Sequence, residues 1–187
     1  MAMRVCERCA GDLGPPRKGP SPRYCSTRCR VAAHRSRQTI PSELRTRERW
    51  VMWRPATKAP LQPTGKAASS TDPATWSAWR RVKTAAHKGY VLGDGIGCID
   101  LDHCVVDGEL TPAAAKFLAQ LPPTWIEVSP SGTGLHVWGR IPEGRGRRYV
   151  NADGLHIERY STGRYITITE REWSGSVRRL ADLSEVG

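Results

Sequence analysis

Residues 95–104 read GIGCIDLDHC, and this stretch sets the kind of sheet that the chain can form. Apolar and acidic residues alternate along it, which is the two-residue period of a β-strand with one apolar face and one polar face. The acids, Asp100 and Asp102, then share a face, where two carboxylates raise each other's pKa unless a cation lies between them. Such oxygen ligands favour Mg²⁺ or Mn²⁺. We expect a divalent-metal site on this strand, although solvated aspartate pairs of the same spacing are common.

A glycine-rich turn followed by a histidine forms a second group. Residues 129–134 (SPSGTG) can turn tightly and expose backbone N–H groups, an arrangement that binds phosphate. His136 lies in the following strand pattern, LHVWGR, where it can point to the same side as the turn. A histidine in a strand is also often structural. The phosphate interpretation assigns nucleotide binding to Ser131, Gly132, Thr133, Gly134 and His136.

A third group lies in residues 155–160, LHIERY, where Glu158 alternates with apolar residues and can supply a further carboxylate. The alternative is an ordinary exposed acid on a strand. Arg164 follows shortly after this strand, and Lys58 and Lys66 lie in an earlier loop. These three basic residues are candidates for phosphate contacts.

The remaining pattern predicts an α+β domain with a mainly antiparallel sheet. Asp72 as N-cap, Pro73 at the first helical position and Gly89 at the end predict a helix over residues 73–88. A second helix is expected over residues 111–121, again with proline at its first position. The basic stretch EGRGRR at residues 143–148 is expected to be a loop. Further strands are expected at residues 50–54, 90–92, 124–129, 135–140 and 164–169.

The N-terminal segment has the spacing of a zinc site. Two close cysteine pairs, with two and three intervening residues, are separated by a polar loop rich in proline, and such pairs supply the tetrahedron that zinc prefers. His34 is the rival ligand, and four unrelated thiols are the alternative. Because protein ligands fill all four positions, we expect a structural site. The predicted ligands are Cys6, Cys9, Cys25 and Cys29. The expected organisation is a zinc module at 1–37, a linker at 38–49 and a main domain at 50–187.

The charge of the chain indicates a polyanionic partner. Lys and Arg number 29 against 18 acids, a formal net charge of +11, and nucleic acid is the usual partner for such a surplus. The segment that carries Cys29 is expected to be helical, and its density of arginines favours phosphate contact. No run approaches the roughly 20 apolar residues of a membrane span, and the N-terminus lacks a signal-peptide core, so we expect no membrane partner and a cytoplasmic location. The arginines concerned are Arg28, Arg30, Arg35 and Arg37.

Four separated stretches, in this order, resemble a known family. They are WRPATKAPLQPTGKAASSTDPATW at 53–76, GIGCIDLDHC at 95–104, EVSPSGTGLHVWG at 127–139 and IERYSTGRYITIT at 157–169. Together they resemble the primase-polymerase domain of the archaeo-eukaryotic primase superfamily. The most similar branch is that of bifunctional DNA primase/polymerases of phages and plasmids. The resemblance covers roughly residues 50–170.

The resemblance implies an RNA-recognition-like sheet with packed helices and a two-metal transfer of nucleotides from (d)NTPs along a single-stranded DNA template. It places the catalytic acids on Asp100, Asp102 and Glu158, and the triphosphate on Ser131 to His136, with His136 counted among the catalytic residues. It also implies a phage or plasmid setting in a bacterial host cell, and a helicase acting in trans is a further expected partner.

Two other functions fit the same residues. A catalytically inactive, zinc-containing nucleic-acid-binding module would keep the fold without the chemistry, because function depends on the site and not on the fold. A metal-dependent nuclease or a cyclic-nucleotide synthase would use the same acids. A histidine beside a phosphate-binding turn favours the binding of a triphosphate over simple hydrolysis.

Overall fold

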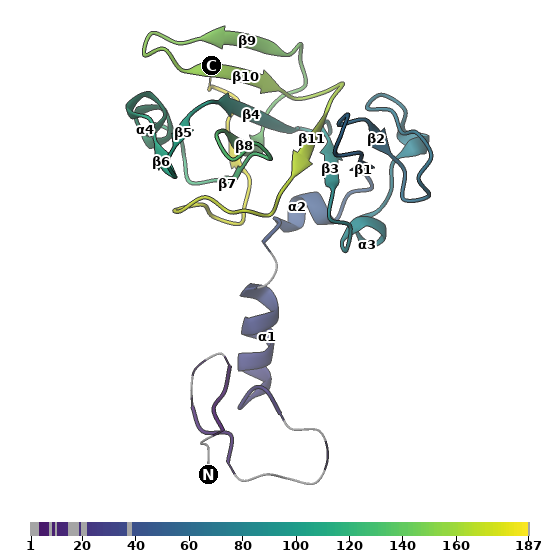
Figure 1. The fold of residues 1–187 in the computed structure, drawn as a ribbon, viewed down its shortest axis with the longest axis vertical. Coiled ribbons are helices and arrows are strands. Elements are labelled where there is room, and N and C mark those ends of the chain that lie inside the picture. Colours follow the sequence, from purple (N-terminus) through teal and green to yellow (C-terminus); the bar gives the residue numbers. More distant parts are fainter. Residues whose placement is uncertain are drawn as a thin grey trace. The chain divides into compact units, whose positions relative to one another are not determined.

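The computed structural model describes residues 4–7, 9, 11–14, 19, 22–32 and 39–186 in full, together with the backbone of residues 33–36. The chain divides into two compact units, Met1–Thr39 and Ile40–Gly187 (Figure 1). Within the described ranges, no helix has the length and the apolar character that crossing a membrane requires.

The described part of the first unit contains one helix, α1 (Thr27–Ser36), and a short turn that brings Val5 opposite Asp12. Ser26 caps the helix, because its Oγ accepts a hydrogen bond from the Cys29 backbone N–H at 3.1 Å. The helix expected around Cys29 is thus confirmed. The cap fixes the first helical turn, on which Cys29 lies.

The second unit is a mixed α/β structure with mostly antiparallel sheets and few helices. A six-stranded sheet has the order β12-β8-β4-β10-β9, with β7 also paired to β8, and a four-stranded sheet has the order β11-β3-β1-β2. Among the described strand pairs, only that of β12 with β8 is parallel.

The larger sheet consists of β4 (Ile96–Asp102), β7 (Trp125–Val128), β8 (Leu135–Arg140), β9 (Arg147–Val150), β10 (His156–Tyr160) and β12 (Ala181–Asp182). The smaller sheet consists of β1 (Trp50–Trp53), β2 (Pro60–Leu61), β3 (Lys88–Val91) and β11 (Tyr165–Ile168). A ribbon is formed by β5 (Val105–Val106) and β6 (Glu109–Leu110). The helices are α2 (Ser42–Arg45), a 3₁₀ turn at Pro73–Thr75, α3 (Trp79–Val82) and α4 (Pro112–Ala119).

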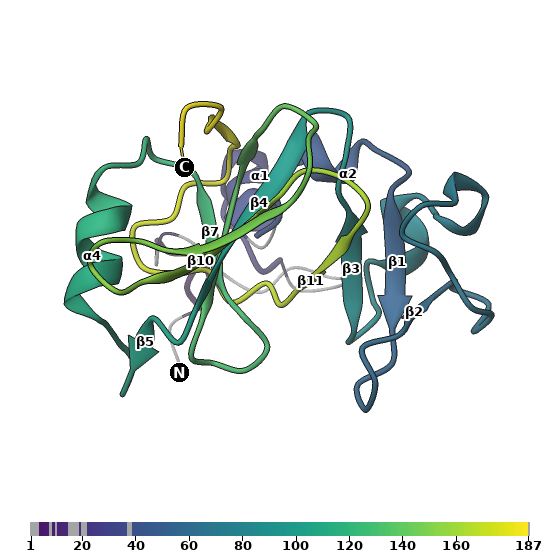
Figure 2. The same ribbon diagram turned by 90° about the horizontal axis from the view of Figure 1, so that it is seen from above.

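Strand β4 has a different apolar cluster on each of its faces. Ile99 and Leu101 belong to the cluster that includes residues of α4, whereas Ile96 and Cys98 belong to the cluster shared with the four-stranded sheet. Figure 2 shows the consequence: α4 and strands β1 to β3 lie at opposite ends of the unit, with β4 and β10 between them. The face of β4 that carries Ile96 and Cys98 is therefore apolar in its first half, and its second half carries Asp100 and Asp102.

Aromatic side chains join the two sheets. Trp50 and Tyr90 come from the smaller sheet, and Trp125 and Trp138 come from the larger one, and all four are buried. The Tyr90 and Trp138 rings meet edge to face, with centroids 6.2 Å apart. Such pairs contribute about 0.5–1.5 kcal/mol beyond the burial of their surface. The two sheets therefore pack around a common core.

The helix expected over residues 111–121 is confirmed as α4. Thr111 is its N-cap and accepts a hydrogen bond from the Ala114 N–H at 3.3 Å, and Pro112 occupies the first helical position. The continuous helix expected over residues 73–88 is wrong, because only Trp79–Val82 of this stretch form an α-helix, α3. Asp72 does cap a turn, but this turn is a 3₁₀ helix that ends at Thr75. Ser77 then exchanges backbone hydrogen bonds with Trp50, which holds the chain extended.

Two further expectations differ from the structure. The basic stretch 143–148 was expected to be a loop, but Arg147–Val150 form β9 because they pair with β10. Such pairing depends on a distant partner and not on local propensity. Residues 40–49, expected in a linker, pack within the second unit, where Ile40 and Leu44 are buried in the core.

Candidate active site

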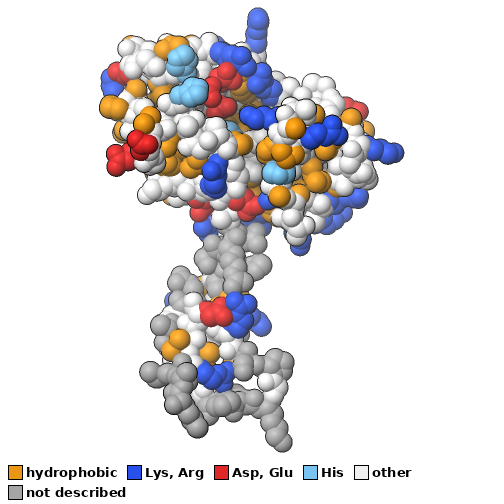
Figure 3. Space-filling view, in the orientation of Figure 1, with side chains coloured by type: hydrophobic (Ala, Val, Ile, Leu, Met, Phe, Trp, Pro, Cys, Tyr) orange, Lys and Arg blue, Asp and Glu red, His pale blue; other side chains and the backbone are white. Residues whose placement is uncertain are grey.

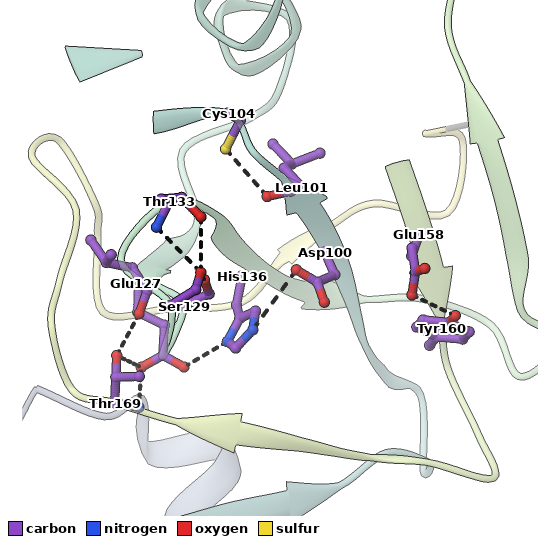
Figure 4. A network of polar contacts seen from close by, with 12 residues as sticks. Asp100, Leu101, Cys104, Glu127, Ser129, Thr133, His136, Glu158, Tyr160 and Thr169 are labelled. Carbon is purple, nitrogen blue, oxygen red and sulfur yellow. Dashed lines mark hydrogen bonds and ion pairs between the residues drawn. The ribbon is translucent and has the colours of Figure 1, made fainter. Parts of the chain in front are cut away.

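A row of charged side chains crosses one face of the six-stranded sheet. Glu127 on β7 lies opposite His136 on β8, and His136 in turn lies opposite Asp100 on β4. Asp100 lies opposite Glu158 on β10. Since directly opposed residues of an antiparallel pair project from the same face, the register alone assembles this row from four separate strands. Figure 4 shows these four side chains together.

The end of the row at Glu127 is buried and fully hydrogen-bonded. Glu127 has no exposed surface, and its Oε2 accepts hydrogen bonds from the backbone N–H groups of Thr169 and Glu170, both at 2.9 Å. Its Oε1 lies 3.3 Å from Nδ1 of His136. An ionised carboxylate only accepts hydrogen bonds, so Nδ1 carries a proton and Nε2 points along the row, 3.8 Å from Oδ1 of Asp100.

The pKa values of Asp100 and His136 are both raised above their ordinary values. Burial raises the pKa of Asp100; the charge of His136 opposes this shift, and the charges of Asp102 and Glu158 add to it. Burial disfavours the charged form of His136, but the hydrogen bond and charge of Glu127, with the charge of Asp100, outweigh it and raise the pKa of His136. A cation next to Asp100 would relieve the cost of ionising this carboxyl group.

The other end of the row is more open. Glu158 pairs with Arg148 on β9, whose Nε lies 2.9 Å from Oε1, and the hydroxyl of Tyr160 donates to Oε2 at 2.7 Å. The Arg148 Nε also lies 2.6 Å from the Tyr160 oxygen. The guanidinium carbon of Arg164 lies 4.2 Å from the centre of the Tyr160 ring, a cation–π contact. Glu158 is thus held by its own strand and by β9.

A cavity of about 370 Å³ opens beside Asp100 and Asp102. It brings basic groups, hydroxyls and carboxylates together, as a site for an anionic ligand and a metal ion requires. Figure 3 shows acidic side chains near β4 and β10 with Lys and Arg side chains beside them. Of the residues predicted from the sequence, the cavity lining includes Lys58, Asp100, Asp102, Ser131, Thr133, His136 and Arg164.

Some predicted residues lie elsewhere. Glu158 lines a neighbouring hollow, which it shares with Asp102. Lys66 is not among the described residues that line the cavity. Gly132 and Gly134 shape the turn: Gly132 has a φ of +85°, and a Cβ on Gly134 would lie 2.7 Å from the Leu101 carbonyl oxygen. Both positions therefore favour glycine.

The turn between β7 and β8 presents hydroxyl groups more than backbone amides. The Gly132 N–H donates to the Ser129 carbonyl at 3.0 Å, and the Thr133 N–H donates to the Ser131 hydroxyl at 3.3 Å. Two of the amides expected to bind phosphate are thus engaged within the turn. The hydroxyls of Ser131 and Thr133, 3.1 Å apart, belong to residues that line the cavity.

Glu127 is a site residue that was not predicted from the sequence. Its signal was present in TWIEVS, where an acid interrupts a strand whose other positions are mostly apolar. Such an acid either faces solvent or contacts a buried partner, and which of the two occurs depends on how the strand pairs with its neighbours. Arg148 and Tyr160 were missed for the same reason, since they reach Glu158 through the pairing of β9 with β10 and through alternation along β10.

The first unit holds the predicted thiol cluster. The ligand atoms of its four cysteines lie within 4.8 Å of one another, with 3.6 Å between the Cys9 and Cys25 sulfurs and 3.5 Å between those of Cys25 and Cys29. Tetrahedral zinc–thiolate bonds of about 2.3 Å place the sulfurs about 3.8 Å apart, so the cluster fits a zinc ion. Hydrogen bonds with Cys29 and then Cys9 raise the pKa of Cys25 to about 12, and a bound cation would reverse this shift.

The predicted phosphate contacts of α1 are described only in part. Arg28 and Arg30 are exposed. Arg37 and the side chains of Arg35 and His34 lie outside the described residues, so the alternative zinc ligand stays a prediction.

Comparisons with known proteins give a matching family model and a related phage protein. The family model described as bifunctional DNA primase/polymerase, N-terminal, matches residues 28–182. The match takes in every residue of the charged row, and of the four clustered cysteines it includes only Cys29.

A relative from Nitratiruptor phage NrS-1, described as a DNA primase-polymerase, is 35% identical over 154 residues. The alignment takes in 74% of this chain and 21% of the relative, so the chain spans about a fifth of the relative's length.

Proposed function

We propose that this chain, which belongs to the family of N-terminal domains of bifunctional DNA primase/polymerases, is a DNA-directed primase/polymerase that transfers nucleotides from (d)NTPs to a growing strand. One observation supports this most strongly. Asp100 and Asp102 line the same cavity as the basic side chains of Lys58 and Arg164. Ligands for a hard cation and groups for phosphate thus lie side by side, which nucleotidyl transfer requires.

In this proposal Asp100 and Asp102 hold Mg²⁺ or Mn²⁺, with Glu158 as the third carboxylate. The oxygen donors and the raised pKa of Asp100 fit such an ion. A bound pair of divalent ions would supply Lewis acidity to the attacking 3′-hydroxyl and the leaving pyrophosphate. Each Glu158 oxygen accepts one contact, from Arg148 or from Tyr160, and keeps a further lone pair for a metal ion.

The triphosphate occupies the cavity in this proposal. Lys58, Arg164 and the cationic form of His136 balance its charge, and the hydroxyls of Ser131 and Thr133 donate hydrogen bonds. His136 is suited to this role because Glu127 fixes its Nδ1 proton and directs Nε2 toward Asp100. Gly132 and Gly134 maintain the turn, and Lys66 stays a prediction.

The first unit would support the reaction without taking part in the chemistry. Four thiols would bind Zn²⁺ as a structural ion, and exposed Arg28 and Arg30 would contact single-stranded template. The RNA-recognition-like character of the main sheet, a helicase acting in trans and a setting in a bacterial host cell all stay predictions.

The test is template-directed synthesis. The protein is incubated with single-stranded DNA of defined sequence, Mg²⁺ or Mn²⁺, and labelled dNTPs or NTPs, with and without a primer. We expect a product whose sequence is complementary to the template and whose formation requires the metal. Product without a primer would identify primase activity.

Two results would contradict the proposal. Intact DNA binding without any product would favour the inactive nucleic-acid-binding module. Release of pyrophosphate from NTPs without a template would favour a cyclic-nucleotide synthase.

A further inference from the structure

A second hollow, of about 280 Å³, adjoins the cavity described above. Asp102 lines both, and the two hollows lie toward different neighbours of β4: the cavity toward β8 and the second hollow toward β10 and β9. Asp102 therefore lies between the cavity and the second hollow. The second hollow is lined by Asp102, Arg148, Tyr149, Val150, His156, Ile157 and Glu158.

We propose that the second hollow binds the 3′-terminal nucleotide of the DNA strand being extended, and that Arg148 contacts its phosphodiester group. This inference rests on the proposed function, because nucleotidyl transfer joins two substrates at one metal cluster. The triphosphate is the more highly charged of the two and fits the cavity with more basic residues. The strand end must then reach the acids from another side, and the second hollow adjoins them there.

Arg148 gives the second hollow one permanently cationic side chain, which can contact one phosphodiester group. Its charged lining consists of Arg148 with the acids Asp102 and Glu158, and His156 lies beside them, whereas the cavity has two permanently cationic side chains, Lys58 and Arg164, beside Asp100 and Asp102. The Arg148 side chain is 61% exposed, and both of its described hydrogen-bonding contacts use Nε. The terminal amino groups of the guanidinium therefore remain available for phosphate oxygens.

Strand β9 supplies a matched control. Arg147 and Arg148 are consecutive and both exposed, but consecutive strand residues project from opposite faces. Arg148 lies opposite Glu158 and so shares the face of the acids, whereas Arg147 lies opposite Arg159. Replacing either residue by glutamine removes the same charge from the same sheet edge.

The experiment measures single-nucleotide extension of a primed template by the full chain. It compares the wild type with the variants Arg148→Gln and Arg147→Gln. For Arg148→Gln we expect the KM for primer ends to rise about tenfold, the loss of one charge-assisted phosphate contact, with the KM for the nucleotide unchanged. The salt dependence of binding to the primed template, as the slope of log K against log salt, should become shallower by about 0.9. Arg147→Gln should match the wild type in both.

Tyr160→Phe separates a strand contact from an effect through Glu158. It removes a hydrogen bond to Glu158 but no positive charge. If Arg148→Gln and Tyr160→Phe both raise the Mn²⁺ concentration needed for activity and neither changes the KM for primer ends, Arg148 acts on Glu158 and the inference is wrong.

Two further results would overturn the inference: equal effects of the two arginine variants, or an equal loss of affinity for unprimed template, which would place the template in the hollow. A wild-type protein that extends no primer would overturn the proposed function and this inference together. Normal extension by Arg148→Gln with an unchanged primer KM would overturn the inference alone.

Discussion

The two candidate metal sites of this chain are built in opposite ways. The thiol cluster comes from two pairs of cysteines that are close in sequence, and its ligands can complete a tetrahedron by themselves. The carboxylate row comes from distant strands, and its acids line spaces large enough for substrates. A closed set of ligands suits a structural ion, whereas an open one leaves coordination positions for a reaction.

The two sites also differ in what supports them. The thiols hydrogen-bond weakly with one another, and the Cys25 thiol is held protonated unless a cation is present. The carboxylate row is anchored without a metal, since the Glu127 carboxylate accepts backbone hydrogen bonds and in turn holds His136. The first unit should therefore depend on its metal for order, whereas the second should fold without its metal and need it for activity.

The sharpest way to break this comparison is to remove the acids. Asp100→Asn with Asp102→Asn should lower nucleotide incorporation by on the order of a thousandfold or more, because the two residues act as one unit. Zinc content and the circular-dichroism spectrum should stay as in the wild type. Activity within tenfold of the wild type would mean that the metal for chemistry binds elsewhere.

A change at the buried end of the row should have the next largest effect. In Glu127→Gln the amide oxygen must stay with the backbone donors at Thr169 and Glu170, so the NH₂ group meets Nδ1 of His136. The ring must then accept at Nδ1, and it loses its cationic form. We expect a fall in kcat/KM for the nucleotide of about 10–100-fold, as for other buried partners of site residues.

A double-variant cycle checks this pathway. If Glu127 acts through His136, adding Glu127→Gln to His136→Gln should cost little more than His136→Gln alone. Additive losses would show that Glu127 has a separate, structural role.

Removing thiols from the zinc cluster tests the other half of the comparison, the structural metal site of the first unit. Cys6→Ser with Cys9→Ser should abolish zinc binding and most unprimed synthesis, while extension of an existing primer changes little. Cys104→Ala, which alters a buried thiol outside the cluster, is the matched control and should retain zinc. Equal loss of initiation and extension in the double variant would instead indicate a general role in folding.

The smallest effect concerns pH and stability. Because burial raises the pKa of Asp100, ionising this group costs the folded state stability as the pH rises through the carboxyl range. Without divalent ions, Asp100→Asn should melt at a higher temperature than the wild type at pH 7, by about 2–4 °C for each kcal/mol removed. The difference should vanish at acidic pH, where Asp100 is protonated in both states.

Divalent ions provide the control for this prediction. Mg²⁺ should raise the melting temperature of the wild type and leave that of Asp100→Asn nearly unchanged, since ligands stabilise only the state that binds them. A lower melting temperature of the variant at pH 7 would contradict the raised pKa of Asp100.

The sequence predicts those parts of the molecule that are encoded locally. The cysteine spacing, the helix around Cys29 and the helix that begins with Pro112 each depend on residues within a few positions of one another. The acids of β4 were found because a strand's alternation fixes which side chains share a face. These features depend on helix and strand geometry alone.

The remaining features depend on pairing between distant segments. The stretch 73–88 has helical signals, but Ser77 forms backbone hydrogen bonds with Trp50 instead. Strand β9 exists because β10 pairs with it, and Glu127 enters the site because β7 lies beside β8. No local sequence pattern specifies which of these strands pair or in which register, so these contacts could not be predicted from the sequence.

The most direct test of the account is a measurement of Mn²⁺ binding by electron paramagnetic resonance, on the wild type and on Asp100→Asn with Asp102→Asn, with zinc content determined on the same samples. The account predicts that the variant loses Mn²⁺ binding and keeps its zinc, because two independent sites hold the two metals. Undiminished Mn²⁺ binding in the variant would show that these aspartates are not the metal ligands.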